Sequence, residues 1–202
     1  EINGLGDAAV YIQVTRGAAP RIHHFPGSIP PTVWVTASPF DAYRMERERG
    51  APVVTVPDIR WLRCDIKTTS LLPNVLANEE ARRRGAVDAI FVRDGRVTEG
   101  TNSTVCAVDG GRLRTHPEGP FILSSVTRTV VLGLCKDIGV EVIEEPVPAN
   151  DLAGMDEVLL LSTTKEIIPV VSVDGTPVGD GSPGPVTRRL QAAFTELTCR
   201  GA

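Results

Sequence analysis

Hydrophobic and polar residues alternate along two stretches near the start of the chain, residues 8–17 and residues 31–39. Both stretches are rich in β-branched side chains, so this period of two predicts two β-strands. The segment between them contains three separated proline sites, which predict a loop because proline lacks a backbone N–H. Residues 40–50 are highly charged and end in glycine, which is typical of a linker or an exposed turn.

From Ala51 onward, short apolar strands alternate with stretches that have the helical spacing of apolar residues. Helices are predicted at residues 70–86 and 124–139, each closed by a glycine, and from Pro185 toward the C-terminus. Strands on either side of a glycine-containing turn predict hairpins, and apolar runs predict further strands. The hairpins are at residues 88–100 and 103–116, and the further strands are at residues 51–56, 140–147 and 156–175.

These elements predict a mixed α/β (α+β) fold with three parts. Residues 1–38 would form a partial small N-terminal domain, residues 39–50 an interdomain linker, and residues 51–202 a large domain of helices and mixed or antiparallel strands. Two strands alone are only marginally stable in water, so the small domain needs neighbours. The chain also begins at Glu1 rather than at a methionine, and we therefore expect a fragment that lacks an N-terminal segment.

The composition argues against several classes of protein. The 202 residues are 42% hydrophobic and 23% charged, as in ordinary globular proteins, and no stretch comes near the roughly 18 apolar residues of a membrane span. The net charge is -4 and the arginines are scattered, which argues against a nucleic-acid partner; the run at residues 82–84 is interpreted as the solvated end of a helix. The cysteines form neither a CxxC pair nor a zinc-like spacing with histidine, which predicts reduced thiols in a cytoplasmic protein.

Lysine is rare in this chain, since only three of its 21 cationic residues are lysines. One of them, Lys67, lies in the stretch DIRWLRCDIKTTS, after an isoleucine and before three small hydroxylic residues. Unlike arginine, a lysine amine can lose its proton and attack a carbonyl group to form a Schiff base. The local sequence alone still favours an ordinary surface lysine, because such lysines are far more common.

Three other stretches have features that would serve a cofactor bound to that lysine. Glu99 precedes a glycine and a run of small polar residues, and a carboxylate placed in this way could keep the ring nitrogen of pyridoxal phosphate protonated. Val126 and Thr127 stand at a predicted helix start, where free N–H groups favour a phosphate. The turn at residues 162–164 offers hydroxyl and N–H groups as well. Taken singly, each stretch is interpreted more simply as a hairpin corner or a helix cap.

Taken together, these stretches resemble the fold-type IV (class IV) pyridoxal-phosphate-dependent aminotransferases, and within that family the D-amino acid enzymes. The resemblance runs through nearly the whole chain in an ordered series of segments: YIQVTRG, PRIHHFP, DIRWLRCDIK, VTEG, ILSSVTR, STTKEIIPV and GDGSPGPVTRRLQ. Such a series is far more specific than any single motif. It implies transfer of an amino group from a D-amino acid such as D-alanine to a 2-oxo acid, by a homodimer that uses pyridoxal 5'-phosphate.

The resemblance also implies roles for individual residues. Lys67 falls at the Schiff-base lysine, which carries a proton between substrate and cofactor, and Glu99 falls at the acid that pairs with the ring nitrogen. Arg21 and His23 match an Arg-x-His loop that holds the substrate carboxylate across the dimer interface. The other implied cofactor residues are Arg60, close to the cofactor, Leu123, which supports the ring, and the phosphate contacts Val126, Thr127, Ser162 and Thr163.

Other functions stay open. An aminodeoxychorismate lyase or a branched-chain aminotransferase would have the same fold, although the Arg-x-His loop argues against both, and a truncated chain without catalytic competence is a further alternative. The resemblance also implies that the family's N-terminal segment, which carries the main phosphate-binding arginine, is missing here, and we expect this as part of the fragment. Two positions also depart from the family pattern. Thr104 stands where asparagine is common, and Lys165 stands where a small residue is common and is expected to point to solvent.

Overall fold

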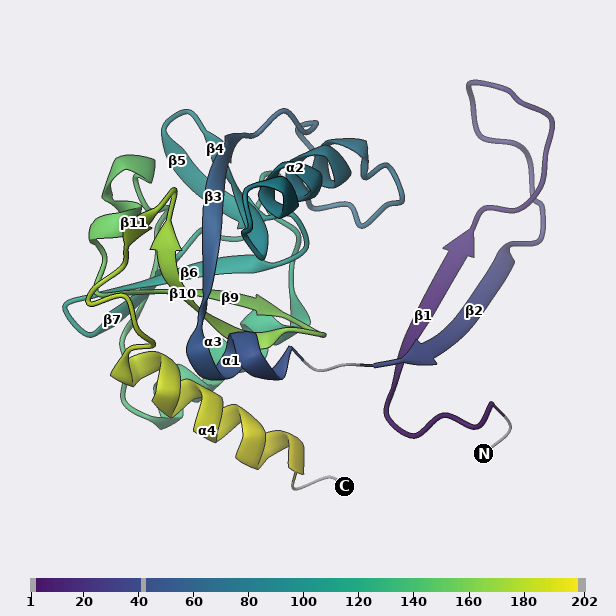
Figure 1. Cartoon of the computed structure of the whole chain (residues 1–202). Helices are drawn as coiled ribbons and strands as arrows, with labels where there is room; N and C mark the ends of the chain where they lie inside the picture. Colours follow the sequence, from purple (N-terminus) through teal and green to yellow (C-terminus); the bar gives the residue numbers. More distant parts are fainter. Residues whose placement is uncertain (1–2, 41–42, 200–202) are drawn as a thin grey trace. The chain divides into compact units, whose positions relative to one another are not determined.

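The computed structural model describes residues 3–40 and 43–199. The chain divides into two compact units, Glu1–Ala42 and Tyr43–Ala202, and each is described by itself (Figure 1). Within the described residues, no helix has both the length and the apolar character that are needed to cross a membrane.

The first unit is a two-stranded antiparallel sheet with a long loop. Strands β1 (Ala8–Thr15) and β2 (Thr32–Pro39) pair along their full length, and the loop with its prolines lies between them, as the sequence predicts. At the start of this loop Gly17 has a φ of 114°. A Cβ atom there would lie 2.2 Å from the carbonyl oxygen of Pro30, so the close approach of the two backbone segments requires glycine.

One face of this small sheet is apolar and exposed. The side chains of this face alternate along each strand, as the period of two requires. They are between 58% and 65% exposed, so the pair of strands buries little apolar surface within its own unit. These side chains are Val10, Ile12 and Val14 of β1 and Val33 and Val35 of β2.

The second unit contains a mixed sheet of nine strands in the described residues. The strand order is β5-β4-β3-β10-β9-β6-β7-β8, with β11 paired to β10 (Figure 1). Strand β3 runs parallel to β4 and to β10, and β7 runs parallel to β8, whereas the other neighbouring pairs are antiparallel. This arrangement confirms the predicted mixed α/β fold. The strands are β3 (Ala51–Pro57), β4 (Asp88–Arg93), β5 (Arg96–Gly100), β6 (Thr104–Asp109), β7 (Arg112–Thr115), β8 (Val142–Glu144), β9 (Glu157–Ser162), β10 (Glu166–Val173) and β11 (Thr176–Pro177).

Two tight turns shape the first predicted hairpin and its exit. One joins the two strands of the hairpin, and the other leads into the second hairpin. Asp94 and Gly95 have positive φ values of 50° and 72°, as a two-residue hairpin turn requires, and they link β4 to β5. The N–H of Gly100 then donates to the carbonyl oxygen of Ser103 at 2.7 Å, which turns the chain directly from β5 into β6. Glu99 therefore sits one residue before a sharp turn at the end of a strand.

Three long helices lie at the predicted places. They are α2 (Leu72–Arg83), α3 (Val126–Asp137) and α4 (Pro185–Cys199). The arginines at residues 82–84 close α2 and pair with acidic side chains at its exposed end, as expected. All three helices belong to the second unit.

Strand β9 is buried on both sides, and its alternating residues belong to different cores. Leu159 and Leu161 pack in a core with side chains of α3 and α4. Val158 and Leu160 point the other way, into a core formed mainly by β3, β5, β6 and β10. A third, smaller core joins α2 to β3 and β4. The second unit thus has cores on both faces of its sheet.

The sequence does not predict two helical segments. Residues 40–50 are not only a linker or turn, because they contain helix α1 (Arg44–Arg49), and residues 41 and 42 lie outside the described residues. Arg47 of α1 pairs with Glu166 of β10, and Arg188 of α4 donates to the Arg47 carbonyl oxygen at 3.2 Å. These partners lie 119 and 141 residues away along the chain, so the local sequence cannot reveal them. The second segment is a 3₁₀ helix, η1 (Ala149–Gly154).

Candidate active site

A buried arginine connects the segment after β3 with strand β5. Arg60 is 9% exposed, and its Nε and Nη2 atoms each donate to the Asp58 carboxylate at 2.9 Å. Its Nη1 atom donates to Oε1 of Glu99, and the guanidinium group lies 4.3 Å from the ring centre of Phe91 in β4. One arginine therefore holds two carboxylates in place and stacks on an aromatic ring.

A second arginine shares the Asp58 carboxylate, whose side chain is fully buried. Nη2 of Arg93 lies 3.1 Å from Oδ1 of Asp58, and its Nε donates to Oδ2 at 3.2 Å. Burial by itself would raise the pKa of Asp58, but hydrogen bonds from Arg60 and Arg93 lower this pKa to about 2. Asp58 is therefore ionised at neutral pH and holds both guanidinium groups in position.

Glu99 has both of its carboxylate oxygens engaged. Oε1 accepts from Arg60, and Oε2 accepts from the backbone N–H of Leu123 at 3.0 Å. Burial raises the pKa of Glu99, while Arg60 and the Leu123 N–H oppose that rise without cancelling it. A further cationic partner, such as a protonated ring nitrogen, would therefore stabilise the ionised carboxylate.

Lys67 lies in the irregular segment between β3 and α2, and its side chain is exposed. This segment is tied to the one that contains Leu123, because the Cys64 N–H donates to the Pro120 carbonyl oxygen at 2.8 Å. Arg60 reinforces the connection by donating to the Phe121 carbonyl oxygen at 3.2 Å. The segments that carry Lys67 and Glu99 are thus both bonded to residues 120–123.

The N-terminus of α3 offers free N–H groups. Ser125 caps the helix by accepting from the Arg128 N–H at 3.2 Å, in line with the predicted cap. Helix geometry leaves the N–H groups of Val126 and Thr127 without intrahelical partners, and the Val126 side chain is 81% exposed. These two N–H groups and the helix dipole suit an anion such as a phosphate ester.

The turn between β9 and β10 offers a second set of donors. The Lys165 N–H donates to Oγ of Ser162 at 3.2 Å, which leaves the Ser162 hydroxyl proton available for another acceptor. Thr163 and Thr164 are exposed. Strand β9, which ends at Ser162, pairs with β6, whose first residue is the buried Thr104.

The expectation that Lys165 points to solvent is wrong. Lys165 is 2% exposed, and its Nζ atom donates to Oδ2 of Asp88 at 2.8 Å and to Oδ1 of Asn102 at 2.6 Å. A buried ammonium group is tolerated only when it is paired, and the fully buried Asp88 at the start of β4 supplies the opposite charge. Asp88 precedes Lys165 by 77 residues, so the local sequence does not point to this pair.

Arg21 and His23 lie in the exposed loop of the first unit, between β1 and β2. The residues expected to bind the cofactor all belong to the second unit. The part of Arg21 and His23 in substrate binding therefore stays a prediction.

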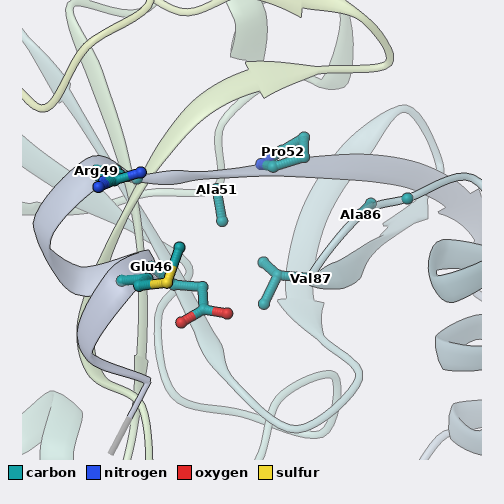
Figure 2. A pocket seen from close by; sticks show the side chains of 9 residues that line it. Glu46, Arg49, Ala51, Pro52, Ala86 and Val87 are labelled. Carbon is teal, nitrogen blue, oxygen red and sulfur yellow. The ribbon is translucent and has the colours of Figure 1, made fainter.

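A separate hollow of about 320 Å³ lies beside the end of α1 (Figure 2). Its walls come from α1, the start of β3 and the turn after α2, and they include Glu46, Arg49 and Val87. The residues expected to bind cofactor or substrate are not among those that line it. The hollow is therefore not part of the candidate site.

Sequence reasoning missed three residues that hold the candidate site residues in place, namely Asp58, Arg93 and Asp88. The role of Asp58 could have been predicted, because it stands two residues before Arg60. At this spacing a bend in the chain brings the carboxylate into contact with the guanidinium group. Arg93 and Asp88 carry no such signal. They lie 35 and 77 residues away from their partners Asp58 and Lys165.

Known proteins resemble this chain in sequence and in fold. Residues 1–173 match the family described as amino-transferase class IV. The chain is 42% identical over 194 residues to a D-alanine aminotransferase from Bacillus licheniformis, and the match covers 96% of this chain and 69% of that protein. A D-alanine aminotransferase from Staphylococcus haemolyticus is 43% identical over 197 residues, which cover 97% of this chain and 70% of that protein.

Solved structures of branched-chain amino acid aminotransferases have the same fold. The Escherichia coli enzyme superposes with a TM-score of 0.84 at 31% identity, and the match covers 94% of this chain and 65% of that one. The Thermobaculum terrenum enzyme in its PLP form has a TM-score of 0.79 at 28% identity, with 93% and 64% covered. This chain therefore spans about two thirds of the length of these relatives. Together with the family match, these similarities show that the chain belongs to the class IV aminotransferases, which use pyridoxal phosphate.

Proposed function

We propose that this protein transfers the amino group of a D-amino acid, such as D-alanine, to a 2-oxo acid. Relatives at 42% and 43% identity that are named D-alanine aminotransferases support this substrate class. The observation that carries the cofactor chemistry of this proposal is the buried Glu99 carboxylate, which Arg60 and the Leu123 N–H hold in one orientation.

The residues of the second unit fit pyridoxal 5'-phosphate. Free N–H groups at Val126 and Thr127, with the hydroxyl and N–H groups of Ser162 and Thr163, would hold the phosphate. Leu123 would pack against the ring, and Glu99 would pair with the ring nitrogen. When bound, the cofactor supplies an electron sink that makes the substrate Cα–H acidic.

The chain's own residues would then move the substrate proton, keep the ring nitrogen protonated and bind the substrate carboxylate. Lys67 would bind the cofactor through its amine. Once the substrate has displaced this amine, it would take the proton from the substrate Cα and pass it to the cofactor. Glu99 would keep a proton on the ring nitrogen, and Arg60 would keep Glu99 ionised. The Arg21 guanidinium would take the substrate carboxylate in a two-pronged hydrogen bond, and His23 would add a donor.

Two further properties belong to the same proposal. We propose a homodimer, in which the loop with Arg21 and His23 reaches the site of the partner subunit. We also propose a cytoplasmic location, which the four free cysteines favour. Light scattering of the purified chain over a range of concentrations tests the dimer.

A branched-chain aminotransferase is the second candidate, because solved enzymes of that class share the fold at TM-scores of 0.84 and 0.79. An aminodeoxychorismate lyase of the same fold is a third. Initial rates with D-alanine, L-leucine and aminodeoxychorismate separate the three. A clear preference for either of the latter two would overturn the proposed substrate class.

The proposal is tested first at its lysine. The purified chain is mixed with pyridoxal phosphate and reduced with borohydride, which fixes the cofactor covalently to any lysine that holds it. Mass spectrometry of a digest then locates the added mass. We expect it on Lys67 and not on Lys136 or Lys165. Equal labelling of all three lysines, or none, would mean that this chain alone does not form the site.

A further inference from the structure

Lys165 occupies an unusual place for a charged residue. It closes the turn that contains the expected phosphate contacts Ser162 and Thr163, yet its side chain is 2% exposed. Its Nζ atom has two acceptors, Oδ2 of Asp88 at 2.8 Å and Oδ1 of Asn102 at 2.6 Å. The ammonium group is therefore buried in a polar network with Asp88 and Asn102.

Asp88 is the centre of that network and is fully buried. Its Oδ1 atom accepts from the Ala89 N–H at 2.9 Å and from the N–H and the hydroxyl of Thr101 at 3.1 Å and 2.5 Å. Its Oδ2 atom accepts from the Ser103 hydroxyl at 2.7 Å as well as from Lys165. The Asp88 carboxylate thus binds Thr101 and Ser103 in the loop that follows Glu99. Lys165 connects the β9–β10 turn to the same carboxylate.

Helix α2, which follows Lys67 in the chain, joins the same network. Asn74 donates to the Thr101 carbonyl oxygen at 2.8 Å, and Asn78 donates to the Thr101 hydroxyl at 3.0 Å. Hydrogen bonds at Asp88 and Thr101 therefore join three segments that carry or adjoin expected cofactor residues: the start of α2, the loop after Glu99 and the β9–β10 turn. The connection from the β9–β10 turn to this point runs through the Lys165 side chain.

We propose that Lys165, held between Asp88 and Asn102, is a positioning residue that fixes the turn of Ser162 and Thr163 for the cofactor phosphate. This inference rests on the proposed function. Its physical basis is the cost of ordering, because a turn that is already fixed loses less conformational freedom when it binds an anion. The Lys165 charge is neutralised by Asp88, so the residue acts by holding the turn and not by attracting the phosphate itself.

The test uses two ligands that differ only in the phosphate. Pyridoxal phosphate and pyridoxal share the ring and the aldehyde, and pyridoxal lacks the phosphate. Equilibrium dissociation constants for both are measured by absorption titration of the full chain, of Lys165→Met and of Lys136→Met. Lys136 is an exposed lysine near the end of α3, so its replacement is a matched control.

We expect Lys165→Met to raise the dissociation constant for pyridoxal phosphate about tenfold and that for pyridoxal less than about twofold, because the ordering cost of the turn falls on the phosphate alone. Lys136→Met should change neither. Equal weakening of both ligands, or no weakening of either, overturns the inference and leaves the proposed function standing. An unmodified chain that binds neither ligand overturns the proposed function and the inference with it.

If Lys165→Met does not fold, the same test can be made with a second variant, Asn102→Ala. Asn102→Ala keeps the ion pair and removes the amide acceptor of Lys165 from an exposed side chain. We expect it to weaken pyridoxal phosphate about threefold and to leave pyridoxal unchanged, because the turn remains attached to Asp88 but loses one of its two anchors. An equal change for both ligands, or no change, again overturns the inference.

Discussion

Asp58 makes the stability of the second unit depend on pH in a way that the structure quantifies. Its side chain is fully buried, and hydrogen bonds from two arginines overcome the effect of burial and lower its pKa from 3.8 to about 2. A carboxyl group with a lowered pKa stabilises the folded chain above its unfolded pKa. This stabilisation is lost as the pH falls from 3.8 toward 2. The shift of nearly two pKa units corresponds to about 2.5 kcal/mol in total, at about 1.4 kcal/mol for each unit.

The assay is urea unfolding of the wild-type chain and of Asp58→Asn, followed by helical circular dichroism. The helices among the described residues all belong to the second unit, so this signal reports on that unit. We expect the wild type to be more stable than the variant near pH 7. The gap in unfolding free energy should shrink by about 2 kcal/mol between roughly pH 5 and pH 2, as the Asp58 carboxylate becomes protonated.

A gap that stays constant from about pH 5 to pH 2 would refute this reasoning, because it would mean that Asp58 is not preferentially ionised in the folded chain. Asp65→Asn is the matched control. Asp65 pairs with Arg63 on the exposed side of the same segment, at 2.9 Å. Exposed ion pairs contribute little, so this variant should follow the wild type at every pH.

Three further predictions concern single residues. Lys67→Arg should take up no cofactor label after borohydride reduction while keeping its circular dichroism spectrum, because arginine cannot form the required bond; labelling at an unchanged level would contradict the assignment. Glu157→Gln should lower the free energy of unfolding by about 1–2 kcal/mol, because its buried carboxylate accepts two N–H groups and a hydroxyl at the start of α4. The exposed Glu141→Gln serves as its control in urea unfolding. Asp88→Asn should destabilise the chain more than Lys165→Met. In Lys165→Met the Asp88 carboxylate keeps four other donors, whereas in Asp88→Asn the buried Lys165 ammonium group loses the negative charge of Asp88; the reverse order of urea midpoints would contradict this.

Elements that are specified by their own residues were predictable from the sequence. The hairpin at Asp94 and Gly95 has the turn residues that its geometry needs, and α3 has a capping serine at its start and Gly139 beyond its end. Helix α1 was not predictable. Its charged residues show no apolar stripe, and the contacts that hold it come from Glu166 and Arg188, far along the chain.

The same distinction applies to the candidate site. Lys67 and Glu99 could be proposed because the segments that contain them belong to an ordered series that resembles a known family. The residues that orient them do not stand out, because an arginine such as Arg93 has the same local appearance whether it is solvated or holds a buried carboxylate. Lys165 shows this most clearly, since it was expected to point to solvent at a position where the family often has a small residue, and its actual partner is Asp88.

The two units divide the proposed chemistry between them. The expected cofactor residues, from Arg60 to Thr163, belong to the second unit, where Asp58 and Asp88 each anchor a buried network behind them. The expected carboxylate-binding residues Arg21 and His23 belong to the first unit, whose strands expose one apolar face. Hydrogen bonds within the second unit hold two of the expected cofactor residues, Arg60 and Glu99, in place. Changes at Arg21 should therefore affect substrate selection, whereas changes at the two buried aspartates should affect cofactor affinity and stability.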